Sequence, residues 1–247
     1  MERLELNDGI KMRQKLDKAQ SRAIKKLYLD AINRLKKDID SMGRGTSSEA
    51  LKKFELNKLV KKLQAEMESI GEETEKIVKQ GMEEVVDAVV DDAKELLSSL
   101  GLSVEGAYTS VPTRVIESLV SGKVYKGDWS LSEAIWEDIR KNQKDILKVV
   151  SEGLAANKST YEIAKDLEKY INPNSKKDWD WSKVYPGTKK KIDYNAQRLA
   201  RTLVNHAYQQ AIIVTSKNNP FVEGIRWETS NSHGRVCDIC RDRATQD

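Results

Sequence analysis

The first 111 residues of the chain contain no proline, and this absence constrains the fold more than any other feature of the sequence. Proline interrupts helices because it lacks a backbone N–H and clashes with the preceding turn. In this region apolar residues recur at steps of three and four, which places them on one face of an α-helix. The pattern covers residues 10–42, 51–70 and 78–100, and Gly71 marks a joint or bend. We therefore predict three long helices in the first hundred residues.

Each of these helices is predicted to bury one narrow apolar stripe. The stripes are Leu16, Ala19, Ala23, Leu27, Ala31, Leu35, Ile39 and Met42; Leu51, Phe54, Leu59, Leu63, Met67 and Ile70; and Val78, Met82, Val85, Val89, Ala93, Leu96 and Leu100. Ser48 is placed to cap the second helix, and Gly101 is placed to end the third. Narrow stripes suit a helical bundle or hairpin. An extended arm that completes its burial on another protein fits the same pattern.

Glycine and proline gather after residue 101, so we predict a domain boundary there. Residues 1–105 form the long-helix arm or bundle, residues 106–127 form a connector with a short helix at 114–120, and residues 128–247 form a C-terminal module. No apolar run in the chain approaches the ~20 residues that a membrane-spanning helix needs. We therefore expect no membrane association.

Two capping boxes open the helices of the C-terminal module, at Ser130–Glu133 and at Ser159–Glu162. The first helix carries an apolar stripe of Leu131, Ile135, Ile139, Ile146, Val150 and Leu154, and the second one of Ile163, Ala164, Leu167 and Tyr170. Asn172 and Pro173 end the second helix. We predict that the two helices form a hairpin.

A third helix of the module is followed by a short strand. The helix stripe is Ile192, Ala196, Leu199, Leu203, Ala207, Ala211 and Val214, and Asn218–Pro220 ends it. Ile225, Trp227 and Thr229 then alternate with charged residues, which is the period of a strand with one buried face. The predicted fold class is mainly α, with long N-terminal helices and a C-terminal helical module that carries a small β element.

The order of these elements resembles the C-terminal part of the phage head morphogenesis family, the minor head proteins similar to the F protein of phage Mu. The motifs that carry the resemblance are Gly153–Leu167, Arg201-Thr202 with Ala207, Trp227, and the Arg-Val-Cys-x-x-Cys of Arg235–Cys240. Together they lie within residues 128–243. The resemblance assigns structural roles to Arg201, Thr202, Trp227 and Arg235.

The resemblance implies a structural protein rather than an enzyme. Minor head proteins of this family join the assembling head of a tailed phage or prophage. The expected partners are the portal protein and the capsid or scaffold protein, with an effect on DNA packaging or ejection. The expected location is the host cytoplasm during assembly and then the phage head within the virion.

Cys237 and Cys240 are spaced so that both thiolates can bind one tetrahedral zinc ion. His233 lies four residues before Cys237 and is the candidate third ligand. A fourth ligand would come from Asp242, from Asp247, from water, or from residues beyond Asp247. Two unliganded thiols at this corner are the alternative. A redox role is disfavoured, because no βαβ pattern surrounds the motif.

Residues 174–191 interleave aromatic and basic side chains. Trp179 and Trp181 could stack on bases, and Lys189, Lys190 and Lys191 could contact phosphates of DNA. The alternative is a surface loop whose tryptophans pack on the helices or on a neighbouring subunit.

The charge of the chain is unevenly distributed. Residues 1–62 contain 17 basic and 9 acidic residues, whereas residues 63–105 contain 3 basic and 12 acidic residues. This pattern predicts helices that pair through opposite charge or present solvated faces. A nucleic-acid-binding protein that uses the basic N-terminal helices is an alternative. A metal-dependent or transferase-type enzyme is another, although the sequence contains no recognisable catalytic motif.

Overall fold

A computed structural model describes residues 7–41, 48–103, 106–122, 130–174 and 192–225. These residues form six helices and no strand, which confirms the mainly α fold class. The helices are α1 (Asn7–Ser41), α2 (Glu49–Ser99), α3 (Val111–Ser121), α4 (Leu131–Ala155), α5 (Thr160–Ile171) and α7 (Tyr194–Lys217). None of them is long and apolar enough to cross a membrane. The predicted β element falls at residues 225–229, of which the structure describes only Ile225.

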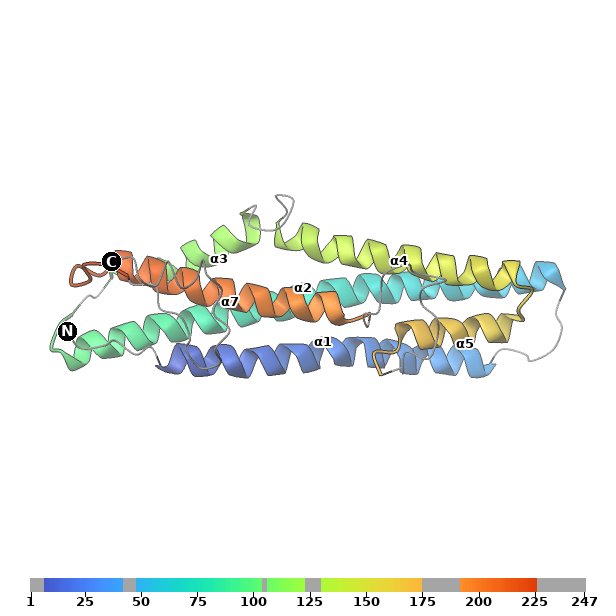
Figure 1. Ribbon diagram of the computed structural model, residues 1–247, viewed down its shortest axis with the longest axis horizontal. Coiled ribbons are helices and arrows are strands. Elements are labelled where there is room, and N and C mark those ends of the chain that lie inside the picture. Colours follow the sequence, from blue (N-terminus) through green and yellow to red (C-terminus); the bar gives the residue numbers. More distant parts are fainter. Residues whose placement is uncertain (1–6, 42–47, 104–105, 123–129, 175–191, 226–247) are drawn as a thin grey trace, which may run out of the picture.

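The helices form an elongated rod around an antiparallel pair, α1 and α2 (Figure 1). Helix α4 packs along the first half of α2, and α5 turns back from α4 to lie against α1. Helix α7 packs on α1 and on the second half of α2, with α3 beside it. All six helices contribute buried residues to one hydrophobic core. The core therefore extends across the predicted connector at 106–127, which itself holds the predicted short helix as α3.

Helix α2 runs without a break for 51 residues, so the prediction of a joint at Gly71 is wrong. The first hundred residues form two long helices rather than three. Gly71 is buried where α4 crosses α2. A Cβ atom at this position would lie 3.0 Å from Ile139 Cγ1 and 3.5 Å from the Trp136 ring. The glycine therefore allows close packing between two helices instead of a bend in one.

The predicted stripe of α2 is wrong at both ends. Leu51 and Phe54 are 47% and 66% exposed, and Leu100 is 55% exposed. The ends of α2 extend past the helices that cover its middle (Figure 1), so apolar residues there have no neighbour to pack on. Between these ends the stripe is confirmed from Leu59 to Ala93, and all of its members are buried.

The first half of α1 is rotated relative to the predicted stripe. Gln20, Ile24 and Tyr28 are buried, whereas Ala19 is exposed and Ala23 is only half-buried. Gln20 is accommodated because its Nε2 donates a hydrogen bond to the Ile77 carbonyl oxygen at 2.7 Å. The apolar pattern alone did not predict that Gln20 is buried, because its burial depends on a hydrogen bond to α2.

The predicted caps at Ser48, Ser130 and Ser159 and the predicted helix end at Gly101 are confirmed. Ser48 accepts a hydrogen bond from the Leu51 N–H, and both capping boxes, at Ser130 and Ser159, are present. Gly101 follows α2 with a φ of 70°, a left-handed conformation that suits glycine. These features depend on residues close together in sequence, and α4 and α5 pack as the predicted hairpin.

Ion pairs link the two long helices, and one of them, Arg34 with Glu66, joins the basic segment to the acidic segment. Arg34 of α1 binds Glu66 of α2 through two hydrogen bonds of 2.7 and 2.6 Å, and Lys62 of α2 lies 2.6 Å from Asp38 of α1. At the other end of α1 the Asp92 carboxylate accepts hydrogen bonds from the backbone N–H groups of Asp8 and Gly9, at 3.3 and 2.8 Å. A side chain of α2 thus caps the first turn of α1.

We expect Asp92→Ala to lower the free energy of unfolding by ~1 kcal/mol, because it removes a carboxylate from free N–H groups at a helix start. Asp91→Ala is the matched control, since its side chain is 71% exposed and forms an ion pair with Lys94 at 3.5 Å. Urea unfolding followed by circular dichroism measures both. Equal stabilities of the two variants would contradict this role for Asp92.

Candidate functional site

The structure places two of the residues that the sequence singled out. Arg201 and Thr202 lie on α7, and Arg201 Nε donates a hydrogen bond to Asp17 Oδ1 of α1 at 2.7 Å. The two side chains of this ion pair are 53% and 40% exposed, so the pair orients α7 on α1 more than it stabilises the fold. Thr202 contributes to the wall of a pocket between α1, α2, α4 and α7.

The other predicted site residues lie outside the described part of the chain. They are Trp179, Trp181, Lys189, Lys190, Lys191, Trp227, His233, Arg235, Cys237 and Cys240. The zinc and nucleic-acid sites therefore stay predictions. Within the described residues, no group of three or more His, Cys, Asp or Glu side chains is arranged to hold a metal ion.

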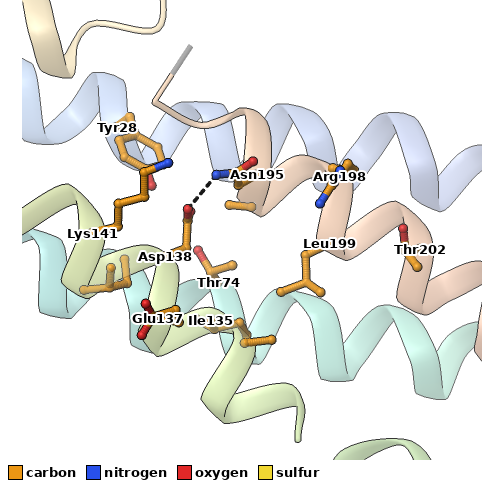
Figure 2. Close-up of a pocket in the computed structure, with 13 residues that line it drawn as sticks. Tyr28, Thr74, Ile135, Glu137, Asp138, Lys141, Asn195, Arg198, Leu199 and Thr202 are labelled. Atoms are coloured by element: carbon orange, nitrogen blue, oxygen red, sulfur yellow. Dashed lines mark hydrogen bonds between the residues drawn. The ribbon is translucent and has the colours of Figure 1, made fainter. Parts of the chain in front are cut away.

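A pocket of about 790 Å³ opens near the middle of the rod, where α1, α2, α4 and α7 meet (Figure 2). Its lining residues are Tyr28, Thr74, Ala134, Ile135, Glu137, Asp138, Ile139, Lys141, Asn195, Ala196, Arg198, Leu199 and Thr202. Aliphatic side chains form part of the wall, and charged or polar side chains form the rest. This combination is typical of small-molecule sites.

Asp138 of α4 is the central polar group of this pocket. Its Oδ1 accepts a hydrogen bond from Asn195 Nδ2 of α7 at 2.8 Å (Figure 2). Its Oδ2 is buried and receives no hydrogen bond from the described residues. One carboxylate oxygen thus accepts a hydrogen bond across the helix interface, and the other has no hydrogen-bond partner among the described residues.

Two residues with hydroxyl groups, on other helices, also belong to the pocket lining. Thr74 of α2 is 2% exposed, and its Oγ1 has no hydrogen-bond partner among the described residues. Tyr28 of α1 is fully buried, and its hydroxyl accepts a long hydrogen bond of 3.5 Å from Asn142 Nδ2. Buried polar atoms without partners are uncommon in folded proteins and point to a bound molecule or water.

The charge state of the pocket follows from its burial. Desolvation raises the pKa of Asp138, while the hydrogen bond from Asn195 and the positive charge of Lys141 oppose that rise. The pKa of Tyr28 is raised well above its usual value by burial and by the charges of Asp138 and Asp193. Tyr28 therefore stays protonated at neutral pH, and the carboxyl group of Asp138 is costly to keep ionised.

Nearby buried acids are satisfied by their neighbours. Tyr170 donates a hydrogen bond to Asp145 Oδ2 at 2.8 Å, and Gln197 Nε2 donates to Asp193 Oδ2 at 2.7 Å. These pairs lock α5 to α4 and stabilise the start of α7. They differ from Asp138, whose second oxygen accepts no hydrogen bond from the described residues.

We expect Asp138→Asn to raise the free energy of unfolding at neutral pH by about 1 kcal/mol, because it removes a buried charge that is incompletely hydrogen-bonded. The sign follows from the raised pKa: this group favours the folded state at acidic pH, where it is protonated, and that contribution is lost as the pH rises through the folded pKa. The gain from the substitution should therefore shrink toward acidic pH. Urea unfolding of both proteins across this pH range measures the difference, and a constant difference would contradict it.

The sequence contained one signal for this site that the predicted stripe of α4 passed over. That stripe steps from Ile139 directly to Ile146, and the buried positions between them are the polar residues Asn142 and Asp145. A polar residue in place of an expected apolar one indicates a buried hydrogen-bonding layer. The partners of these two residues, Tyr28 on α1 and Tyr170 on α5, could be identified only from the structure.

Comparison of the chain with protein-family models, with curated proteins and with solved structures found no match.

Proposed function

We propose that this protein is a structural minor head protein of a tailed phage or prophage. It associates with the portal protein and with capsid or scaffold protein during head assembly in the host cytoplasm. It then remains in the virion head, where it acts in DNA packaging or ejection. The sequence resemblance over residues 128–243 motivates this proposal, and the shape of the molecule supports it.

The supporting observation is the elongated rod with apolar side chains exposed near both ends. Helix α2 alone, at 51 residues, spans about 75 Å at a rise of ~1.5 Å per residue. Leu51 and Phe54 are exposed near one end of the rod, and Leu100, Phe221 and Ile225 are exposed near the other (Figure 1). Exposed apolar groups of this kind favour contact with other proteins. A rod with exposed apolar side chains near both ends suits a protein that contacts two other parts of an assembly.

The test is co-purification with the portal protein of the same genome, followed by mass measurement of the complex. We expect a complex of defined stoichiometry. Phe54→Ser and Phe221→Ser should weaken it without altering the fold, because these side chains are 66% and 55% exposed. Leu147→Ser is the matched control, since Leu147 is 48% exposed but lies away from the ends of α4.

Two outcomes would overturn the proposal. One is the absence of a portal complex, both for this chain and for a version extended at its C-terminus. The other is a complex that resists both end variants while Leu147→Ser disrupts it, because that result would place the contact on the side of the rod.

A second candidate function is contact with DNA through α1. Lys15, Lys18, Arg22 and Lys26 follow steps of three and four and are all exposed. None of the four forms an ion pair with another described residue, in contrast to Arg34 of the same helix. Affinity for duplex DNA that falls steeply with salt, and falls further when these residues are replaced by glutamine, would favour this function.

A further inference from the structure

We propose that two copies of this chain pair side by side and antiparallel, with a basic row on α1 of each copy against an acidic row on α2 of the other. Both rows consist of exposed side chains at helical spacing. The basic row is Lys15, Lys18, Arg22 and Lys26, and the acidic row is Glu83, Asp87, Asp91 and Glu95. This contact uses the side of the rod, whereas the proposed contact with the portal protein uses its ends.

The acidic row repeats every four residues, so its carboxylates follow one another on successive turns of α2. Glu83, Asp87 and Glu95 form no ion pair with a described residue. Like charges at this spacing repel one another and destabilise a helix. Desolvation and the charge of Asp91 raise the pKa of Asp87, while the charge of Lys94 opposes that rise. Cations placed along this row would relieve the repulsion.

The basic row matches the acidic row in length. It spans about 17 Å from Lys15 to Lys26, at a rise of ~1.5 Å per residue. The acidic row spans about 18 Å from Glu83 to Glu95 on the same basis. None of the four basic side chains forms an ion pair with another described residue. The chain therefore presents two rows of nearly equal length and opposite charge.

The basic row points away from α7. Arg13 donates a hydrogen bond to Asn205 of α7 at 3.3 Å, and Asp17 accepts one from Arg201 of α7 at 2.7 Å. These two residues mark the side of α1 that faces α7 (Figure 1). Lys15 is two residues from each of them, which is about 200° of rotation around the helix. The basic row therefore lies on the outer side of α1.

The acidic row points outward from the junction of α1, α2 and α7. Val89 of α2 faces this junction, because a Cβ atom on Gly9 of α1 would lie 2.9 Å from Val89 Cγ2 and 3.2 Å from Tyr208 Cε2 of α7. Asp87 and Asp91 are each two residues from Val89, again about 200° away. Both rows therefore lie on the outer side of the α1–α2 pair, where a second rod can reach them.

The two rows occupy successive stretches along the rod. Gln20, at the level of the basic row, donates a hydrogen bond to Ile77. Asp92, at the level of the acidic row, accepts one from Gly9. The acidic row therefore lies nearer the start of α1, and the basic row lies nearer its middle. A two-fold axis across the rod, between the two rows, places each row against the opposite row of the second copy.

A second copy fits these rows better than DNA does. The two-fold contact neutralises both rows at once, and it sets Lys18 opposite the partner's Asp87 and Arg22 opposite the partner's Asp91. DNA on the basic row would leave the acidic row unmatched and close to the phosphates. The rows together cover about 30 Å of a surface two helices, or about 20 Å, wide, so each copy buries about 600 Å². This area is at the lower end for specific interfaces, and we expect a reversible, salt-sensitive dimer.

The test is sedimentation velocity of the full, nuclease-treated chain at about 100 μM protein, in about 50 mM and about 500 mM NaCl. We expect a particle of twice the 28.0 kDa chain mass at low salt and the chain mass itself at high salt, because salt screens contacts between exposed charges. A monomer under both conditions would overturn the proposal. A monomer that gains mass only when duplex DNA is added would also overturn it, in favour of DNA contact through α1.

Two charge-reversed variants test the register. Lys18→Glu with Arg22→Glu alters the basic row, and Asp87→Lys with Asp91→Lys alters the acidic row. Each variant alone should associate roughly tenfold more weakly or worse, because like charges then face each other in both contacts. An equimolar mixture of the two variants should recover the dimer, since every facing pair in the mixed complex is again of opposite charge.

Glu117→Lys with Glu223→Lys is the matched control, since it reverses the same number of acidic charges at exposed positions on α3 and after α7. It should dimerise like the unaltered protein. Circular dichroism should show that every variant keeps its helices. The proposal fails if either row variant dimerises as tightly as the unaltered protein, or if the mixture of the two folded variants stays monomeric.

Discussion

Gly71→Pro is expected to lower the free energy of unfolding by about 3 kcal/mol or more. Position 71 lies in the interior of a 51-residue helix. A proline there removes one backbone hydrogen bond, and its ring clashes with the carbonyl group four residues earlier. Urea unfolding followed by circular dichroism measures the loss. Because every other described helix packs on α2, the substitution should destabilise the whole fold rather than one end.

Gly71→Ala is the control that separates helix breaking from crowding. Alanine favours the helix by up to ~1 kcal/mol relative to glycine. Its Cβ would lie 3.0 Å from Ile139 Cγ1, so part of that gain is offset by a tight contact with α4. We expect a small net effect. If Gly71→Pro were as stable as the unaltered protein, α2 would be two helices with a joint, and the interpretation of Gly71 as a close-packing residue would be wrong.

Local signals in the sequence predicted the helices and their ends well. Ser130, Ser159 and Gly101 act on residues within a turn of themselves, and their roles could be inferred without knowledge of the fold. Gly71 was misinterpreted because glycine is compatible with both a bend and a close approach. The crossing of α4 over α2 distinguishes these two cases. That crossing is a tertiary contact, which the local sequence does not reveal.

Burial was harder to predict than helix position. Phe54 is apolar but exposed, because the end of α2 extends past the neighbouring helices. Gln20 is polar but buried, because the Ile77 carbonyl oxygen accepts its hydrogen bond. In both cases, burial depends on whether a residue distant in sequence packs against the side chain. The apolar pattern alone therefore gave the correct face of α2 in its middle and failed at its ends.

The candidate site could not be assembled from the sequence, because its polar groups come from four helices. Asp138 lies on α4, Thr74 on α2, Tyr28 on α1 and Asn195 on α7. These residues are spread over more than half of the chain, and no short motif connects them. The polar gap between Ile139 and Ile146 indicated that α4 meets a buried polar layer. It did not indicate which residues complete that layer.

Leu203→Ala is expected to lower the free energy of unfolding by about 2–5 kcal/mol, the usual cost of a large cavity in a core. Leu203 is fully buried on α7, which packs on both α1 and α2. Because the described helices share one hydrophobic core, we expect a single cooperative unfolding transition. Hydrogen exchange should show amides of α2 losing protection together with those of α7.

Gln209→Ala is the matched control, because Gln209 is an exposed residue of the same helix and its truncation leaves no cavity. We expect its stability to stay within ~0.5 kcal/mol of the unaltered protein. One result for Leu203→Ala would contradict the expected single transition. In it, amides of α7 lose protection while those of α1 and α2 keep theirs, and unfolding shows two separate transitions. That outcome would mean that the N-terminal hairpin folds independently, and that the predicted division between residues 1–105 and 128–247 describes two domains. A shared transition would mean that the C-terminal helices stabilise the long hairpin directly.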